Sequence, residues 1–222
     1  MYGLPELHRE MITNCKITAN PGCYPTASIL ALAPALQENI ITSDIIIDAK
    51  SGVSGAGRAI SLKTHYSEVN ENISAYGLDG HRHMPEIVQE LDLIAKTNTN
   101  ITFLPHLIPM SRGILASCYA PLNMDYFGDM KDIKNNVIEI YKEFYKDEPF
   151  TRVVATPPAT KHTLGSNDCI IYPTVDLRTN RLIVISCIDN LVKGAAGQAV
   201  HNMNIMNGIS ETTGISQLAL YP

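Results

Sequence analysis

The segment Asn20-Pro-Gly-Cys-Tyr-Pro-Thr26 places Cys23 just before the helix-forming run Thr26-Ala-Ser-Ile-Leu-Ala-Leu-Ala33. Thr26 is a residue type favoured at helix N-caps, so the pattern predicts a helix from Thr26 to about Leu36. A thiol at a helix start meets unpaired backbone N–H groups and the positive end of the helix dipole, and both stabilise a thiolate. We therefore expect the pKa of Cys23 to lie below its ordinary value, as in a nucleophile. The alternative is a buried, inert cysteine.

Composition restricts the classes of protein to which this 222-residue chain can belong. The net charge is −5 without a basic block, and no apolar run approaches the length of about 20 residues that a membrane helix needs. This argues against nucleic-acid and membrane partners. The five cysteines form no CxxC pair, which favours reduced thiols in a cytoplasmic protein and predicts no metal site. No strand–GxGxxG–helix unit is present, so the chain is not expected to carry a Rossmann domain.

A glycine-rich segment, Lys50-Ser-Gly-Val-Ser-Gly-Ala-Gly-Arg58, follows the predicted buried strand Asp44–Ala49. Its glycine spacing matches neither a dinucleotide fingerprint nor a P-loop. Small residues let backbone N–H groups approach an anion, and Lys50 and Arg58 add positive charge. The alternative interpretation is a flexible surface turn.

Two histidines precede a predicted helix in Gly80-His-Arg-His-Met-Pro-Glu86. Pro85 at the first helical position, with Glu86 in the first turn, is typical of a helix start. His81 and His83 are therefore candidates for general acid or base, since an imidazole titrates near neutral pH. Metal ligation is disfavoured because no HExxH pattern is present, and the common alternative is a solvated or core histidine.

The remaining elements predict an α+β domain with a mixed, largely antiparallel sheet and helices on one face. Arg112, in the turn 109–113, is a candidate for pairing a phosphate or carboxylate, or else is a surface charge. Segments 1–22 and 66–80 read as largely irregular. The further predicted elements are strands 101–108 and 113–120 joined by that turn, a helix 130–146, a strand 153–155, a hairpin of strands 169–177 and 181–189 around 178–180, and a helix 195–204.

Six stretches in series resemble the N-acetyl-gamma-glutamyl-phosphate reductase family. They are YGLPEL, NPGCYPT, KSGVSGAGR, GHRHMPEI, PMSRGILA and DNLVKGAAGQA, and they span nearly the whole chain. The resemblance implies the catalytic and dimerisation domain of such a reductase, with a fold like the C-terminal domain of glyceraldehyde-3-phosphate dehydrogenase. The resemblance begins inside the family's sequence, so we expect this chain to lack the family's N-terminal NADP-binding Rossmann domain. Residues 1–190 would form the catalytic and dimerisation domain, and residues 191–222 a helix and tail that would pack on the absent domain.

The resemblance also implies a reaction in arginine biosynthesis. NADPH reduces N-acetyl-glutamyl 5-phosphate to N-acetyl-glutamate 5-semialdehyde with release of phosphate. Cys23 would form a thioester, and backbone N–H groups at its helix start would stabilise the oxyanion. His81, or else His83, would serve as the base. Arg82 and Arg112 are the candidates for the substrate's phosphate or carboxylate.

Cofactor and partners follow from the same resemblance. NADP(H) would be bound mainly by the absent domain, and the subunits would form a homodimer or homotetramer through the sheet. The residues expected beside the cofactor are Ser51, Gly52, Ser54, Gly55, Arg58 and Asn190.

Three other functions use the same residues. An aspartate-semialdehyde dehydrogenase has a similar cysteine–histidine pair, although NPGCYPT and GHRHMPEI argue against it. A cysteine–histidine hydrolase needs the same thiolate and base but no cofactor. A dimerisation module without activity of its own is the third, because a chain without its cofactor domain is expected to bind NADPH very weakly and to reduce nothing.

Overall fold

A mixed β-sheet dominates the computed structural model, which describes residues 1–128 and 131–221. Among these residues the strand order is β2-β3-β1-β4-β7-β6-β5. The strands are β1 Asp44–Ser51, β2 Ser74–Ala75, β3 Asn100–Leu107, β4 Ile114–Pro121, β5 Thr151–Val153, β6 Cys169–Asp176 and β7 Arg181–Ile188. Two strand pairs, β1–β3 and β5–β6, are parallel and the others are antiparallel. The predicted α+β class with a mixed, largely antiparallel sheet is confirmed.

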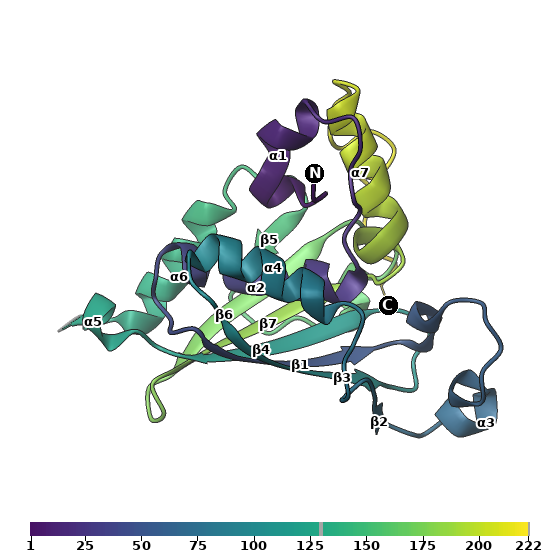
Figure 1. The fold of residues 1–222 in the computed structure, drawn as a ribbon, viewed down its shortest axis with the longest axis horizontal. Helices are drawn as coiled ribbons and strands as arrows, with labels where there is room; N and C mark the ends of the chain where they lie inside the picture. The colour runs from purple at the N-terminus through teal and green to yellow at the C-terminus, as the bar shows by residue number, and fades with distance from the viewer. Residues whose placement is uncertain (129–130, 222) are drawn as a thin grey trace.

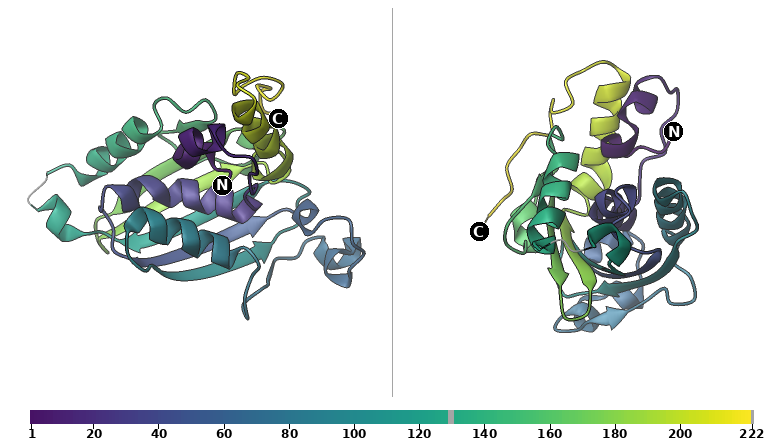
Figure 2. Two further views of the ribbon diagram at one scale, coloured as in Figure 1. Left: turned by 45° about the horizontal axis from the view of Figure 1, so that its top comes forward. Right: turned by 90° about the vertical axis from the view of Figure 1, so that its left-hand side faces the viewer.

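The long helices gather on one face of this sheet, as predicted, whereas the short α3 lies near the β2 end (Figures 1 and 2). Helices α2, α4 and α6 lie on the sheet, and α1 packs against α7 at one end. The helices are α1 Pro5–Thr13, α2 Cys23–Gln37, α3 Tyr66–Val69, α4 Met84–Ala95, α5 Met124–Phe127, α6 Ile133–Phe144 and α7 Gly197–Met206, with 3-10 turns at Val53–Ala56, Leu62–Thr64 and Thr160–Thr163 and a π-helical turn at Val192–Ala196.

The expected pairing of strands 101–108 and 113–120 across a short turn is wrong. Strand β1 lies between them, parallel to β3 and antiparallel to β4. The connection passes the end of β1, where the Gly52 N–H donates to the Gly113 carbonyl (3.0 Å). A Cβ at Gly52 would lie 2.8 Å from the backbone of Ser111, so the crossing requires glycine. Local turn residues could not reveal this because a distant strand supplies the pairing. The hairpin of β6 and β7 is confirmed, with Asp176 opposite Arg181.

Helix α2 begins three residues earlier than predicted, and the N-cap assignment of Thr26 is wrong. The N-cap is Gly22, which makes Cys23 the first helical residue. The Thr26 hydroxyl donates back to the Gly22 carbonyl at 3.0 Å instead of capping the helix. Pro25 fits this first turn because its missing N–H is one that the turn leaves unpaired in any case. The thiol therefore lies inside the helix start and not ahead of it.

Other element boundaries differ in smaller ways. Helix α1 was not predicted, although Pro5 at its first position is a start signal. The segment expected to be irregular contains the short α3 and β2. Strand β5 begins two residues before the predicted Val153, and the last helix is preceded by the π-helical turn. The expected start of the α6 helix, Met130, lies outside the described residues.

Two features bear on the setting of the chain. All five cysteines are free thiols. Among the described residues, no helix combines the length and the apolar character required to cross a membrane.

Helix α2 accommodates a proline, Pro34, with help from α6. Pro34 has no N–H, so the carbonyl of Leu30 one turn earlier lacks its helical donor. The hydroxyl of Tyr145, at the end of α6, donates to that carbonyl at 2.6 Å. The neighbouring Tyr141 hydroxyl donates to the Ala31 carbonyl at 2.7 Å. Both tyrosines are buried, so these bonds fasten α6 to the helix that carries Cys23.

Removing these two hydroxyls should have unequal effects on stability. Tyr145→Phe leaves the buried Leu30 carbonyl without a donor, and we expect it to lower the free energy of unfolding by about 1–3 kcal/mol. Tyr141→Phe is the matched control: a regular helix already supplies a donor to Ala31, so about 1 kcal/mol or less should be lost. Urea unfolding of both variants measures the difference. An equal loss would contradict the compensation of Pro34 by Tyr145.

Candidate active site

Cys23 lies in the wall of a cavity of about 320 Å³. Its side chain is half-buried at the first position of α2. The π-helical turn packs behind it, because a Cβ on Gly194 would lie 2.7 Å from the Cys23 Cβ. The cavity is also lined by residues of the glycine-rich segment, of the excursion 59–76 and of the turn before α4. Elements far apart in the sequence thus meet at the thiol.

The environment of Cys23 does not lower its pKa, and that expectation is wrong for this structure. Burial raises the pKa of the thiol and is the largest influence. The backbone N–H groups of Tyr24 and Cys23 act in the opposite direction, as does the Arg82 guanidinium. The Glu86 carboxylate raises the pKa further. Near neutral pH the sulfur is therefore a thiol.

The two histidines lie together beside Cys23, and both line the cavity. Their ring centroids are 4.9 Å apart, and the His83 backbone N–H donates to Nδ1 of His81 at 3.1 Å. The His83 ring packs against Gly22, where a Cβ would lie 2.6 Å from its Nε2. Neither imidazole makes a hydrogen bond to the Cys23 thiol among the described residues.

Burial keeps both imidazoles neutral. It is the largest cause that lowers the pKa of His83, to about 4, and His81 and Arg82 lower it further. Burial, followed by Arg82, also lowers the pKa of His81. Because Nδ1 of the neutral His81 ring accepts a hydrogen bond, its proton resides on Nε2. Nδ1 of His83 is buried and has no partner among the described residues.

Of the two candidate arginines, only Arg82 faces the cavity. It is exposed and lies between the two histidines in the sequence. Arg112 lies outside the lining and forms an ion pair with buried Asp189, through Nη2 at 2.8 Å and Nε at 3.3 Å. Asp189 also accepts the N–H groups of Gly165 and Leu191. Arg112 therefore fastens a loop, and its direct contact with substrate stays a prediction.

Only part of the glycine-rich segment lines the cavity. Ser51, Gly52 and Gly55 line the cavity, whereas Ser54 and the exposed Arg58 do not. The predicted cofactor residue Asn190 is 2% exposed. Its amide oxygen accepts the Gly113 N–H (2.7 Å), and its amide nitrogen donates to the Ser54 hydroxyl (2.9 Å). In this geometry Asn190 secures the loop, and its contact with a nicotinamide also stays a prediction.

Sequence reasoning missed several residues of the site. Lys63 adds a second cation to the lining. Tyr24 and Tyr76 also line the cavity, and the Tyr76 hydroxyl donates to the Tyr24 hydroxyl at 2.9 Å. Glu86 accepts the Gly22 N–H at 3.0 Å and the Tyr2 hydroxyl at 3.1 Å, which ties the Cys23 turn to α4. The sequence could have predicted this, because Glu86 follows His83 by three residues and residues at that spacing share a helix face. Nothing in the sequence marks Lys63.

Comparisons with known proteins identify relatives over the whole chain. The family model described as "Semialdehyde dehydrogenase, dimerisation domain" matches residues 23–190. An N-acetyl-gamma-glutamyl-phosphate reductase from Dehalococcoides mccartyi is 54% identical over 223 residues, and those from Geobacter metallireducens and Desulforamulus reducens are each 53% identical. All of this chain is covered, but only 63–64% of each relative. The chain thus spans less than two thirds of their length, and the resemblance drawn from the six stretches is confirmed.

Solved structures show the same fold at low sequence identity. Aspartate semialdehyde dehydrogenase II from Vibrio cholerae has a TM-score of 0.68 and 17% identity, covering 92% of this chain and 67% of that one. The Francisella tularensis aspartate semialdehyde dehydrogenase has a TM-score of 0.65 and 16% identity, with 92% and 70% covered. At these identities the likeness supports the fold alone.

Replacing Glu86 tests how the site controls its thiol. Glu86→Gln keeps an oxygen that can accept from Gly22 but removes a negative charge that opposes the thiolate, so the pKa of Cys23 should fall. The measurement is the rate of alkylation by iodoacetamide against pH, followed on the tryptic peptide 17–50, while Cys15 lies on the separate peptide 10–16. The wild-type midpoint should lie above the ordinary value for a cysteine. Glu139→Gln, a remote and exposed change, is the control. An unchanged or higher midpoint in Glu86→Gln would contradict this account.

Proposed function

This chain belongs to the semialdehyde dehydrogenase family through its dimerisation domain, and we propose that it is the catalytic and dimerisation part of an NADPH-dependent N-acetyl-gamma-glutamyl-phosphate reductase. The reaction is the reduction of N-acetyl-glutamyl 5-phosphate to N-acetyl-glutamate 5-semialdehyde in arginine biosynthesis. The observation that carries the proposal is that Cys23, at the first position of α2, shares one cavity with two neutral histidines and Arg82. The free cysteines agree with a cytoplasmic setting.

The first step is attack of Cys23 on the acyl carbon. The Sγ–C bond forms, the bond from carbon to the phosphate oxygen breaks, and phosphate leaves a thioester. Since burial holds the sulfur as a thiol, its proton transfers as the new bond forms and not beforehand. The His83 ring lines the cavity and packs against Gly22, the neighbour of Cys23, which makes it the candidate acceptor of that proton. A preformed thiolate–imidazolium pair is not the resting state.

His81 acts at the acyl oxygen in this scheme. The bond that its Nδ1 accepts leaves the proton on Nε2, so the ring donates a hydrogen bond where negative charge develops. Arg82, exposed in the lining, is the candidate for the phosphate or α-carboxylate, and Lys63 supplies a second cation for the other anionic group. A substrate with two anionic ends matches a cavity with two cations.

The described residues fit a nicotinamide only at its reactive end. Ser51 and Gly55 line the cavity beside Cys23, and a Cβ at Gly55 would lie 3.2 Å from the Ser51 hydroxyl, so glycine keeps that wall open. Asn190 is already bonded on both sides. NADPH, when bound, would supply the hydride that reduces the thioester. We assign the rest of its binding to a separate domain against which residues 191–222 would pack, with residues 1–190 carrying the chemistry.

The helix-free face of the sheet is the surface we assign to a homodimer or homotetramer. The register aligns Ile46, Tyr119 and Ile183 on neighbouring strands, and all three are at least partly exposed. An apolar row across an open sheet is typical of a surface that pairs with another protein. The description of the matching family model, a dimerisation domain, supports this assignment.

A single-turnover acylation assay tests the thioester. The chain is mixed with N-acetyl-glutamyl 5-phosphate without NADPH, and intact mass and released phosphate are measured. We expect about one acyl group and one phosphate per chain in the wild type, and none in Cys23→Ser because the nucleophile is gone. Cys15→Ser is the matched control, since Cys15 is also a half-buried free thiol. Acylation that survives in Cys23→Ser would exclude the proposal. Repeated cofactor-free turnover would instead favour a hydrolase.

Replacement of His81 separates a role at oxygen from a role at sulfur. His81→Asn should slow acylation by about 10²–10³-fold, as for loss of an oxyanion donor. Alkylation of Cys23 by iodoacetamide, which develops no oxyanion, should change little. His162→Asn, a remote histidine change, is the control. If alkylation and acylation fall together, His81 acts on the sulfur as a base and the division of roles is wrong.

A further inference from the structure

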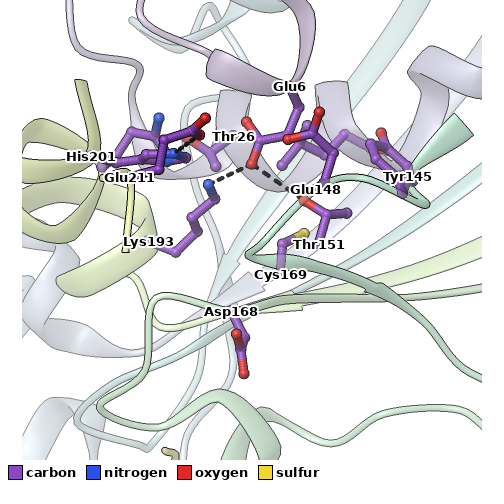
Figure 3. Close-up of polar contacts among 12 residues, drawn as sticks. Glu6, Thr26, Tyr145, Glu148, Thr151, Asp168, Cys169, Lys193, His201 and Glu211 are labelled. Carbon is purple, nitrogen blue, oxygen red and sulfur yellow. Dashed lines mark hydrogen bonds and ion pairs between the residues drawn. The ribbon is translucent and has the colours of Figure 1, made fainter. Parts of the chain in front are cut away.

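A buried ion pair lies behind Cys23, outside the cavity. Lys193 is 0% exposed, and its Nζ lies 2.6 Å from Oε1 of Glu6, whose side chain is 1% exposed (Figure 3). Thr151 donates to the same Glu6 oxygen at 3.2 Å, and the Phe150 ring lies 5.8 Å from Nζ. The pair therefore joins α1, β5 and the π-helical turn, three elements distant in the sequence.

The Lys193 backbone belongs to a turn that contacts the nucleophile. Two i→i−5 bonds define the π-helical turn: the Gly194 N–H donates to the Asp189 carbonyl (2.9 Å) and the Ala196 N–H to the Leu191 carbonyl (3.0 Å). Such turns are rare and often occur at functional sites. Gly194 touches Cys23 closely enough that an added Cβ would lie 2.7 Å from the Cys23 Cβ and 3.2 Å from its Cα.

The same turn also holds the segment before Cys23. The Asn20 side chain donates to the Ala195 carbonyl at 3.1 Å, and its oxygen accepts from Asn202 of α7 at 3.0 Å. The π-helical turn thus contacts the nucleophile's own Cα and Cβ and the loop three residues earlier. A shift of the π-helical turn is therefore expected to displace Cys23.

We infer that the buried Glu6–Lys193 pair is a positioning device for Cys23, fixing the π-helical turn against which the nucleophile rests. Glu6 and Lys193 are positioning residues, because neither lines the cavity. The inference deepens the proposed function, since it rests on Cys23 being the nucleophile.

A charged pair suits this role better than an apolar contact. Two buried opposite charges stay close together, because moving them apart loses the attraction that offsets their removal from water. An apolar contact of the same volume tolerates sliding. Close to the pair, His201 is bonded to Glu211 (2.7 Å), and Arg9 to Glu211 and Glu148. These ion pairs connect α1 to Glu148 and to the C-terminal segment. Arg9 lies on α1, as Glu6 does, and therefore offers a control on the same helix.

The test compares stability with the reactivity of the thiol. Glu6→Gln and Lys193→Met are each measured by urea unfolding and by iodoacetamide alkylation of the peptide 17–50 over a range of pH. We expect both variants to lose stability and to change the Cys23 alkylation rate by about tenfold, which is the effect of a change of about one unit in the pKa of the displaced thiol. The control is Arg9→Met, which loses stability but should leave the Cys23 rate unchanged. A Cys23 rate unchanged in both pair variants would overturn the inference.

A double variant separates positioning from folding. Glu6→Gln with Lys193→Met carries no uncompensated buried charge, so its stability should recover relative to the single variants. The Cys23 rate should stay altered, since the fixed separation is lost. If stability and the Cys23 alkylation rate both recover in the double variant, the pair only stabilises the fold, and the inference is overturned.

Gly194→Ala tests the last contact directly and does not disturb the buried charges. Its methyl group would lie 2.7 Å from the Cys23 Cβ, so the alkylation rate should change, and an unchanged rate would oppose the inference. Alkylation needs no acyl phosphate. A failure of wild-type acylation would therefore remove the proposed function while leaving these measurements interpretable.

Discussion

The packing of helix α2 is the constraint on which the rest of the structure depends. From Tyr24 to Leu36 every residue of the helix is buried, between α4, α6 and the sheet. A helix enclosed in this way has no freedom to turn or slide, so the direction of its first residue, Cys23, is set by the core. The Tyr145 hydroxyl that supports Pro34 belongs to the same constraint at the other end of the helix. The packing of α2 in the core, and not the conformation of a loop, thus determines where the thiol lies.

Enclosure that fixes the thiol also opposes its ionisation. The helix start offers N–H groups and a favourable dipole, yet burial outweighs them, and Glu86 adds a carboxylate because its bond to the Gly22 N–H is needed to close the turn. The nearby imidazoles are lowered in pKa by the same burial. At rest the Cys23 thiol and the two imidazoles are consequently neutral, beside the charged Arg82 and Glu86.

Sequence predicted the parts of this site that depend on local chemistry. Cys23 at a helix start, the His81–His83 turn and the α+β class follow from spacing and residue type, and they are found together in space. Long-range geometry was out of reach. The insertion of β1 between β3 and β4 depends on pairing between strands far apart in the sequence. The direction in which the pKa of Cys23 moves depends on how deeply the folded chain buries the thiol. Lys63 has no local signal because only the return of its loop brings it to the cavity.

The cavity has two walls of different construction, and they divide the work of the site. The wall behind Cys23 consists of α2, the start of α4 and the π-helical turn, all packed or hydrogen-bonded on several sides. The other wall includes the segment 53–80, in which Leu62 and Lys63 are exposed and the secondary structure consists of two 3-10 turns, the four-residue helix α3 and the two-residue strand β2. Groups that must hold a reacting atom within a fraction of an ångström lie on the first wall, whereas a cation suited to recognising a substrate lies on the second. The two cations of the lining are thus held differently, Lys63 on this exposed segment and Arg82 in the turn that joins it to α4, and under the proposed function a change of substrate specificity requires changes at both.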